Sequence, residues 1–321
     1  MKAEALNTLF THLEQQLTQP LGELRRLFHG RGQCFEGLEQ ITVDWLQAKD
    51  SQGQGSQGQL VVALFKEQDL EFVEELEARL KAFVDSELWT NAKGSSILLQ
   101  HRYQELAPTQ VVWGDENTFP VVEENGLKYQ LELKKNQNMG IFLDMRYGRQ
   151  WVQAHSEGKS VLNLFAYTCG FSVAAIAGGA TQVVNLDMAK ASLGRGRDNH
   201  RLNEHDLSKV KFLGHDIFKS WGKIKKLGLY DLIIIDPPSF QKGSFALTKD
   251  YQKILRRLPD LLTENGEVLA CVNSPAVSTD FLIDGMAEEA PELKYIERLD
   301  NPPEFADINP ESGLKVMRFT R

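Results

Sequence analysis

The chain of 321 residues is poor in cysteine, has no long apolar run and carries no excess of positive charge. Its three cysteines, Cys34, Cys169 and Cys271, stand far apart without C-x-x-C spacing, which argues against a zinc site and a disulfide framework. We therefore expect a reducing compartment, the cytoplasm. No apolar run approaches the ~20 residues of a membrane helix, so no membrane partner is expected. The formal net charge of −8 disfavours nonspecific nucleic-acid binding unless basic residues gather locally.

Two phosphate-binding motifs are also missing. A dinucleotide site needs G-x-G-x-x-G, and a P-loop needs a glycine-rich run that ends in Gly-Lys-Ser/Thr. The loop after the first expected strand of the carboxyl-terminal half reads Phe165-Ala166-Tyr167-Thr168-Cys169-Gly170 and holds one glycine. This composition disfavours a pyrophosphate cradle and leaves room for a cofactor with a nucleoside but no phosphate.

From residue 160 onward, strand-like and helix-like segments alternate. This alternation predicts a mostly parallel sheet with right-handed crossovers and helices on both faces. Expected strands cover 160–164, 182–186, 209–213, 231–235, 267–272, 294–299 and 314–320. Expected helices cover 171–178, 189–203, 217–227, 248–264 and 279–289.

For the residues before this region, the sequence predicts a helical segment, 1–24, and a smaller α/β domain, 25–135. The second domain is then expected at 136–321. The Asn125-Gly126 pair is typical of a tight hairpin that ends this smaller domain. Residues 51–59 predict a flexible low-complexity loop. The basic segment 25–32 is compatible with a phosphate contact, although its residue types favour a solvated helix end. Expected helices cover 3–17 and 69–84, and expected strands cover 41–46, 60–65, 97–99, 111–113, 121–122 and 129–133.

Acidic residues end the second and third strands of the later domain. Asp187 could accept both ribose hydroxyls of a nucleoside, with Met188 on a purine face, because ligands bind at this edge of an open sheet. Asp216 could likewise accept from the exocyclic amine of adenine, beside Ile217. Each acid could instead cap the helix that follows it. The residues alone leave both interpretations open.

Asp236-Pro237-Pro238-Ser239-Phe240 follows the fourth strand. The two prolines fix the backbone and prevent a helix start, so carbonyls at this edge stay free to accept hydrogen bonds from a planar substrate. Phe240 could stack on the face of that substrate. A simple turn with a buried phenylalanine is the alternative.

In this order, the single-glycine loop and the three acids resemble class I S-adenosylmethionine-dependent methyltransferases. The Asp-Pro-Pro segment resembles the D-P-P-x motif of enzymes that methylate amino or ring atoms of nucleobases. The match is closer to the bacterial 23S rRNA (cytosine/guanine) methyltransferases, from about residue 25 to the carboxyl terminus, without an amino-terminal PUA domain. The matching segments are Arg26–Gly32, Glu124–Leu127, Gly140–Arg146, Val161–Tyr167, Asp236–Phe240 and Leu314–Val316.

The resemblance implies a Rossmann-like class I methyltransferase domain with a seven-stranded, mostly parallel sheet, preceded by a smaller α/β domain that recognises RNA. It implies S-adenosyl-L-methionine as cofactor and RNA, in the form of 23S rRNA or a ribosomal particle, as partner; a homodimer stays open. The expected catalytic residues are Asp236, Pro237, Pro238, Phe240 and Asn273. The expected cofactor site comprises Phe142, Asp144 and Arg146 at the methionine end, with Asn163, Phe165, Ala166, Tyr167, Gly170, Asp187, Met188, Asp216, Ile217 and Asp236.

The residue after the fifth strand bears on the atom that is methylated. Family members that methylate carbon five of cytosine place a nucleophilic cysteine there, and our alignment puts Asn273 at that place. Cys271 lies two residues earlier, on the same face of an extended strand, and is most typical of a small core residue. Carbon-five methylation needs a covalent thiolate adduct, whereas a nitrogen lone pair attacks the methyl group directly. The sequence therefore favours a base nitrogen.

Three rival functions share these features. A nicotinamide-dependent oxidoreductase has the same fold and an acid after the second strand, but it would need the missing glycines. A non-catalytic RNA-binding protein could use a methyltransferase scaffold. A methyltransferase for small molecules or proteins also stays open, because the fold does not fix the substrate.

Overall fold

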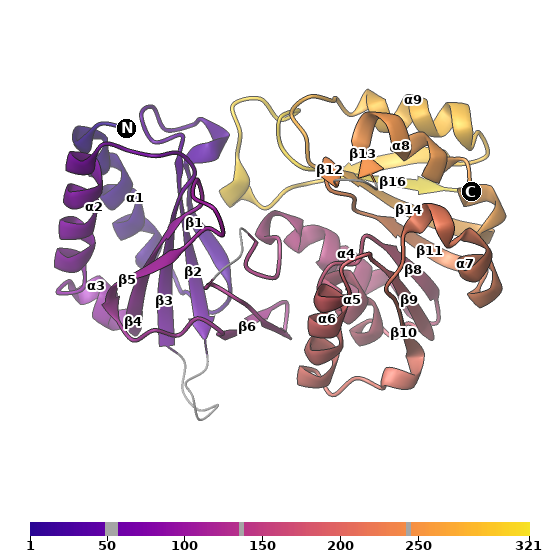
Figure 1. Ribbon diagram of the computed structural model, residues 1–321, viewed down its shortest axis with the longest axis horizontal. Helices are drawn as coiled ribbons and strands as arrows, with labels where there is room; N and C mark the ends of the chain where they lie inside the picture. Colours follow the sequence, from indigo (N-terminus) through magenta and orange to yellow (C-terminus); the bar gives the residue numbers. More distant parts are fainter. Residues whose placement is uncertain (49–56, 135–137, 242–244) are drawn as a thin grey trace. The chain divides into compact units, whose positions relative to one another are not determined.

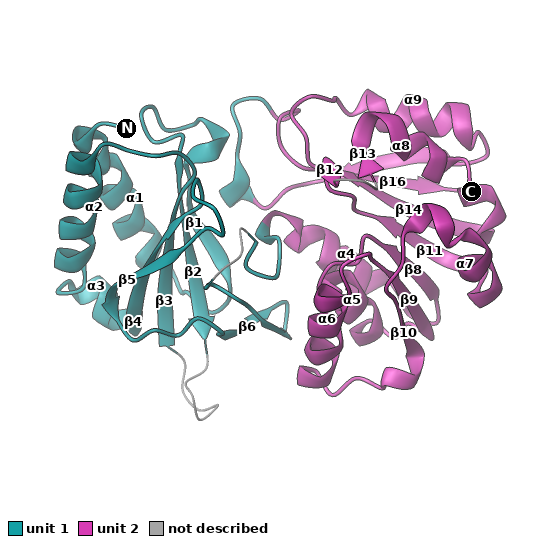
Figure 2. Ribbon diagram, viewed as in Figure 1, with its two compact units in different colours: residues 1–143, 303–309 teal, residues 144–302, 310–321 magenta. Residues whose placement is uncertain are grey.

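The computed structural model describes residues 1–48, 57–134, 138–241 and 245–321 (Figure 1). Contacts divide the chain into two compact units (Figure 2). Unit 1 comprises Met1–Leu143 with Pro303–Asn309, and unit 2 comprises Asp144–Pro302 with Pro310–Arg321. The first unit thus extends eight residues beyond the boundary expected at 135/136, and it also includes a short segment from near the carboxyl terminus.

Unit 1 is built on a seven-stranded sheet in the order β5-β4-β3-β2-β6-β7, with β1 also paired to β2. Helices α1 and α2 lie beside this sheet (Figure 1). The helices are α1 (Leu6–Leu17), α2 (Leu70–Phe83) and α3 (Glu87–Asn91), with 3-10 turns at Ala3–Ala5 and Gly30–Gly32. The strands are β1 (Arg25–His29), β2 (Ile41–Ala48), β3 (Gln57–Leu64), β4 (Gly94–His101), β5 (Thr109–Gly114), β6 (Val121–Glu124) and β7 (Leu127–Gln130).

The amino-terminal helix belongs to the core of unit 1, not to a separate segment. Its leucines recur at helical spacing, so one face of α1 is apolar and packs into the unit's interior. Three of them, Leu6, Leu9 and Leu13, have no exposed surface. The expected helical segment 1–24 is therefore part of the smaller domain.

Two further expectations for this unit need correction. The segment 25–32 is not a helix end: residues 25–29 form strand β1, because Asp44 on the adjacent strand β2 pairs with Arg26 and neutralises it. Of the expected flexible loop 51–59, residues 51–56 lie outside the described residues, and 57–59 belong to β3. The hairpin is confirmed, since Asn125 and Gly126 have φ of 52° and 73°, both in the left-handed region that this tight turn requires.

Unit 2 contains a second seven-stranded sheet in the order β10-β9-β8-β11-β14-β16-β15. The first five strands in this order run parallel, and β16 is antiparallel to both of its neighbours, which confirms the mostly parallel Rossmann-like sheet. The strands are β8 (Ser160–Leu164), β9 (Gln182–Leu186), β10 (Val210–Leu213), β11 (Tyr230–Ile235), β14 (Leu262–Val272), β15 (Lys294–Leu299) and β16 (Lys315–Thr320), with a small hairpin of β12 (Phe240–Gln241) and β13 (Phe245–Ala246).

Helices cover both faces of this sheet because its strands are apolar on both sides. Residues from α7, α8 and α9 share one core with alternate residues of the strands, and α4, α5 and α6 lie together in Figure 1. The helices are α4 (Arg146–His155), α5 (Gly170–Ala177), α6 (Lys190–Leu202), α7 (Trp221–Leu227), α8 (Leu247–Leu255) and α9 (Asp280–Glu289), with 3-10 turns at Leu143–Met145, Leu207–Lys209, Ile217–Lys219, Leu258–Asp260 and Pro303–Phe305.

Three helix predictions in the later domain were inaccurate. The helix expected at 248–264 ends at Leu255, since Pro259 cannot continue it, and strand β14 already begins at Leu262. The helix expected at 217–227 is divided at Ser220 into a 3-10 turn and α7. No helix was expected at the position of α4, whose residues are mostly polar.

We predict that Gly58→Ala destabilises unit 1. A Cβ atom at Gly58 would lie 1.8 Å from Cζ2 of Trp45, a fully buried side chain that cannot move aside. We expect a loss of about 2 kcal/mol in the free energy of unfolding, measured from urea midpoints. Gly22→Ala is the control, because a Cβ atom at Gly22 meets nothing within 4 Å. Equal midpoints for the two variants would contradict this packing.

Candidate active site

The carboxyl ends of five parallel strands place the candidate residues at one edge of the sheet of unit 2. The loop at 165–169 follows β8, and Asp187 follows β9. Asp216 lies three residues beyond the end of β10. Asp236 and Asn273 directly follow β11 and β14. Because parallel strands end on the same side, side chains that lie between residues 165 and 273 of the sequence meet at this edge.

The loop after β8 has an unusual backbone. Phe165, Tyr167 and Cys169 have φ of 58°, 47° and 63°, so three non-glycine residues adopt the left-handed region. Each such residue costs on the order of 1 kcal/mol or more, and the conformation persists only where the surroundings enforce it. The Ala166 N–H donates to the Leu186 carbonyl at 3.0 Å. This loop shape could not be predicted from the sequence, because glycine is the usual residue for a left-handed backbone.

Asp187 holds this loop in place. Its Oδ2 accepts the Tyr167 N–H at 2.8 Å, and its Oδ1 accepts the Ala189 N–H at 2.7 Å. The carboxylate thus joins the loop after β8 to the turn that precedes α6, which is close to the capping role that the sequence left open. Each oxygen keeps a second lone pair with which it can accept a ribose hydroxyl.

Asp216 caps the 3-10 turn that follows it. Its Oδ1 accepts the Phe218 N–H at 2.8 Å, as the capping interpretation expected. The side chain also lines a pocket, so the capping and the ligand-binding interpretations do not exclude each other.

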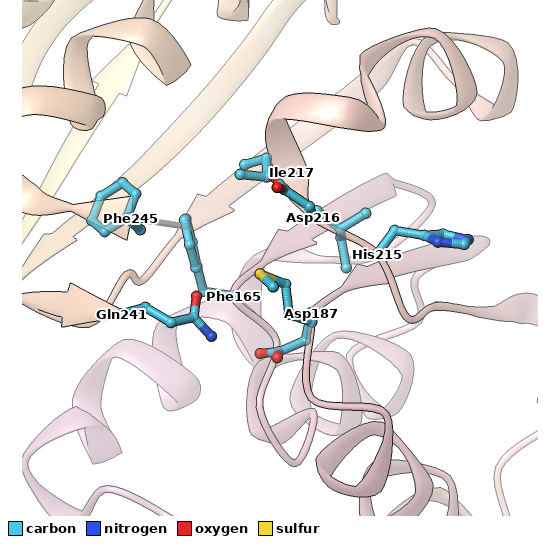
Figure 3. Close-up of a pocket in the computed structure, with 9 residues that line it drawn as sticks. Phe165, Asp187, His215, Asp216, Ile217, Gln241 and Phe245 are labelled. Carbon is cyan, nitrogen blue, oxygen red and sulfur yellow. The ribbon is translucent and has the colours of Figure 1, made fainter. Parts of the chain in front are cut away.

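The pocket lies at this edge (Figure 3). Phe165 and Phe245 meet edge to face, with ring centroids 5.0 Å apart. Gln241 extends toward Phe165 and Asp187 in Figure 3. Of the expected cofactor residues, five line the pocket: Phe165, Asp187, Met188, Asp216 and Ile217. The sequence missed four others: Leu186, His215, Gln241 and Phe245.

The lining fits an adenosyl group that has no phosphate. Two carboxylates, Asp187 and Asp216, face the pocket and would repel a pyrophosphate. Apolar side chains, including Phe165, Met188 and Ile217, can cover the faces of a purine. This set of groups suits a nucleoside with a neutral or cationic tail.

A second cluster lies at the ends of β11 and β14. The Asn273 Nδ2 donates to Oδ2 of Asp144 at 3.1 Å. The Ser239 hydroxyl donates to the Asn273 carbonyl at 3.0 Å, which ties the Asp-Pro-Pro-Ser segment to the end of β14. Burial and then the Asp144 carboxylate raise the pKa of Asp236 to about 7, against the opposing effect of Arg149. The cluster therefore brings together Asp144, Asp236 and Asn273, which the sequence analysis had expected as cofactor-binding or catalytic residues.

Two basic side chains beside this cluster were missed. Arg149 on α4 is 4% exposed, and the sequence analysis expected no helix there. Lys315 on β16 is fully buried, and its Nζ donates to the carbonyls of Ser274 at 3.1 Å, Glu311 at 2.5 Å and Gly313 at 3.0 Å. A lysine flanked by Leu314 and Val316 was the available signal, because a buried ammonium group needs such acceptors. It holds the segment that follows Asn273.

At this edge the Phe240 ring is exposed to solvent, whereas the Cys271 thiol is buried. Phe240 is 69% exposed, so it is not the buried turn residue of the alternative interpretation. Cys271 is fully buried, and burial together with Asp236 and Asp144 raises the pKa of its thiol well above the ordinary value. A thiolate is therefore strongly disfavoured at Cys271. Pro237 is buried and Pro238 is exposed.

Several expected cofactor residues do not line the pocket. The Asn163 side chain is buried and donates to Oδ1 of Asn185 at 2.9 Å, so it supports the sheet and does not face the pocket. Ala166, Tyr167 and Gly170 shape the loop without lining the pocket. Phe142 belongs to unit 1. Arg146 begins helix α4, two residues after Asp144.

Comparison with known proteins decides the family. A family described as S-adenosylmethionine-dependent methyltransferase matches residues 25–320. The chain belongs to this methyltransferase family. It is therefore an enzyme that uses S-adenosylmethionine, as the pocket lining suggested. Among the described residues, no helix has the length and apolar character to cross a membrane.

Relatives and solved structures agree with this family. A Bacillus subtilis protein, YwbD, provisionally named a ribosomal RNA large subunit methyltransferase, is 30% identical over 91% of this chain and 73% of its own length. Ribosomal RNA large subunit methyltransferase I of Aeromonas salmonicida is 37% identical over 50% of this chain and 42% of its own length, so the match spans less than half of that relative. The crystal structure of SMU.776 with SAH, a protein provisionally described as a methyltransferase, has a TM-score of 0.79 at 26% identity, covering 99% of this chain and 80% of that one.

We predict that Asp236→Asn stabilises the protein more at pH 8 than at pH 5.5. The pKa of Asp236 is raised to about 7 in the folded state, from an ordinary value of 3.8. As pH rises from about 4 to 7, the unfolded carboxyl ionises while the folded one stays protonated, so ionisation progressively favours unfolding. Asparagine removes this penalty, and the gain in unfolding free energy should be roughly 1–2 kcal/mol larger at pH 8. A gain that is equal at both pH values, in urea unfolding, would contradict the raised pKa.

Proposed function

We propose that this methyltransferase transfers the methyl group to a base nitrogen in large-subunit ribosomal RNA. The names of the relatives support this substrate, and so does the Asp236–Phe240 segment with its exposed phenylalanine. The observation that carries the proposal is the half-buried Asp236 carboxyl, whose pKa is raised by burial and by Asp144, in a segment that Ser239 ties to Asn273. A carboxyl with a pKa near neutrality at this edge suits the handling of a proton on a reacting amine.

We assign the cofactor's adenosyl part to the pocket. Asp187 accepts the ribose hydroxyls, Asp216 accepts the adenine amine, and the side chains of Phe165, Met188 and Ile217 cover the purine. The methionine end belongs to the cluster that contains Asp144, together with Arg146. When bound, S-adenosylmethionine supplies a methyl group that its sulfonium makes electrophilic.

The residues after β11 are assigned to the acceptor base. The ring of Phe240 stacks on a base that has left its helix, since a base within a duplex is out of reach. The Asp236 carboxylate and the Pro237 carbonyl accept hydrogen bonds from the acceptor's N–H group, which orients the nitrogen lone pair. Asn273, held by Asp144, contributes a further polar group at this position.

Nitrogen is favoured over carbon five because of Cys271. Carbon-five chemistry needs a thiolate that reaches the base, and this thiol is fully buried with a raised pKa. Nitrogen methylation needs only alignment and stabilisation of developing charge, which Asp236 and its neighbours can provide. A nicotinamide-dependent oxidoreductase is not favoured, because the family is one of methyltransferases.

We predict that Asp187→Ala weakens binding of S-adenosylmethionine by about 100-fold in calorimetry. The change removes the ribose acceptor and also the bonds that hold the loop after β8. Asp206→Ala is a matched control: Asp206 accepts the Ser208 N–H in the same kind of turn but does not line the pocket. Its affinity should stay within twofold of wild type. Similar affinity for wild type and Asp187→Ala would refute the cofactor assignment.

We predict that Asp236→Ala lowers kcat by about 100-fold or more, while affinity for S-adenosylmethionine changes less than threefold. The assay transfers a labelled methyl group to ribosomal RNA from a strain that lacks the gene. In the wild type, kcat should rise with pH up to about 7, because the ionised carboxylate is the acceptor. The exposed residue Asp284 provides the control variant, Asp284→Ala. Unchanged turnover in Asp236→Ala would remove this carboxyl from the reaction, and RNA binding without methyl transfer would favour a non-catalytic RNA-binding protein.

A further inference from the structure

Three strands of unit 1 end at one edge of its sheet and bring distant basic residues together. Strands β1 and β3 are both antiparallel to β2, and β4 is parallel to β3, so β1, β3 and β4 run in the same direction. Arg31 lies just beyond β1, Phe65 directly follows β3, and Arg102 directly follows β4. The backbone keeps the last two in register, since the Arg102 N–H donates to the Leu64 carbonyl at 2.8 Å.

Both arginines lie over the same aromatic ring. The guanidinium carbon is 4.3 Å from the Phe65 centroid in Arg31 and 4.7 Å in Arg102. The two cationic carbons are therefore separated by no more than the sum of those distances. Cation–π contact fixes the planar groups while leaving N–H donors at their edges, which is how arginine presents itself to phosphate. We call these three residues the Phe65 cluster.

Arg31 in the Phe65 cluster lies near a second arginine, Arg26. Within the described ranges, Arg31 has no carboxylate partner, whereas the nearby Arg26 is paired with Asp44. Burial and the Arg26 guanidinium lower the pKa of Arg31, and His29 is kept neutral because burial, Arg26 and Arg31 lower its pKa to about 3. An anion that contacts both guanidinium groups of the Phe65 cluster would be attracted by two cations at once.

We propose that the Phe65 cluster binds a phosphodiester of the RNA acceptor. The identity of the polymer rests on the proposed function, whereas the anion chemistry rests on the Phe65 cluster itself. Because guanidinium–phosphate contacts carry no base information, the site positions RNA without reading its sequence. It gives a chain with a formal net charge of −8 a local point of attachment for a polyanion. The sequence allowed a phosphate contact in the basic segment 25–32, which contains Arg31, and the structure adds Arg102.

The test compares RNA affinity with catalysis in four variants: Arg31→Ala, Arg102→Ala, the double variant and Phe65→Leu. Phe65→Leu keeps an apolar side chain but removes the ring on which both arginines stack. Arg79→Ala is the matched control, because Arg79 also lies over a ring, Phe10, but is paired with Glu75 at 2.6 Å. Affinity for unmodified, transcribed large-subunit ribosomal RNA is measured by fluorescence anisotropy over a range of salt, alongside kcat, KM for RNA and affinity for S-adenosylmethionine.

We expect each arginine variant to weaken RNA binding about fivefold or more, and the double variant to reduce the salt slope by about 1.5. KM for RNA should rise with kcat nearly unchanged, and cofactor affinity and the urea midpoint should match those of Arg79→Ala. If the double variant and Phe65→Leu bind and methylate RNA as the wild type does, the Phe65 cluster is not an RNA site and the proposed function stands.

The remaining outcomes separate the two proposals. If the wild type binds RNA without methylating it and the double variant binds more weakly, the phosphodiester site stands and the proposed function fails. If the wild type binds no RNA at all, both fail. A double variant that loses cofactor affinity or stability to the same degree as RNA affinity would show a structural role and overturn the phosphodiester site.

Discussion

The active edge of unit 2 depends on the two hydrogen bonds that the Asp187 carboxylate accepts. One comes from the strained loop after β8 and the other from the turn before α6, so a single side chain joins the ends of two adjacent strands. This tie helps to offset the cost of three left-handed, non-glycine residues in that loop. The loop in turn sets Phe165 against Phe245 and so defines one wall of the pocket.

The two units gather side chains of opposite charge at their candidate binding sites. Unit 2 gathers carboxyl groups at its active edge, Asp187 and Asp216 in the pocket and Asp144 and Asp236 beside it, which suits a cofactor with a cationic sulfonium. Unit 1 gathers guanidinium groups around Phe65, which suits a polyanionic acceptor. A modestly acidic chain can in this way bind a nucleic-acid substrate, because the local charge around Phe65 matters for binding and not the net charge of the whole chain.

The later sheet was predicted well from the sequence, because its strands are apolar runs, each followed by an acid or a glycine-containing loop. The carboxyl ends of parallel strands lie at one edge of the sheet, so these residues were also expected to lie together. Prediction from the sequence failed where a neighbour in space reverses the local preference. The basic residues of segment 25–32 predicted a solvated helix end. In the structure Asp44 on the adjacent strand pairs with Arg26 and neutralises its charge. Arg149 and Gln241 gave no signal, since their roles depend on helix α4 and on a hairpin that follows two prolines. Asn163 had the right position along the chain but points into the sheet, toward Asn185.

The central claim is that the edge between Asp187 and Asp216 holds the adenosyl group and directs the reacting methyl toward Asp236. A crystal structure of the protein with S-adenosylhomocysteine tests this most directly. The account predicts the ribose at Asp187, the adenine beside Ile217 and the sulfur on the side of Asp144 and Asp236. Nucleoside density elsewhere on the protein, or a sulfur directed away from Asp236, would contradict it.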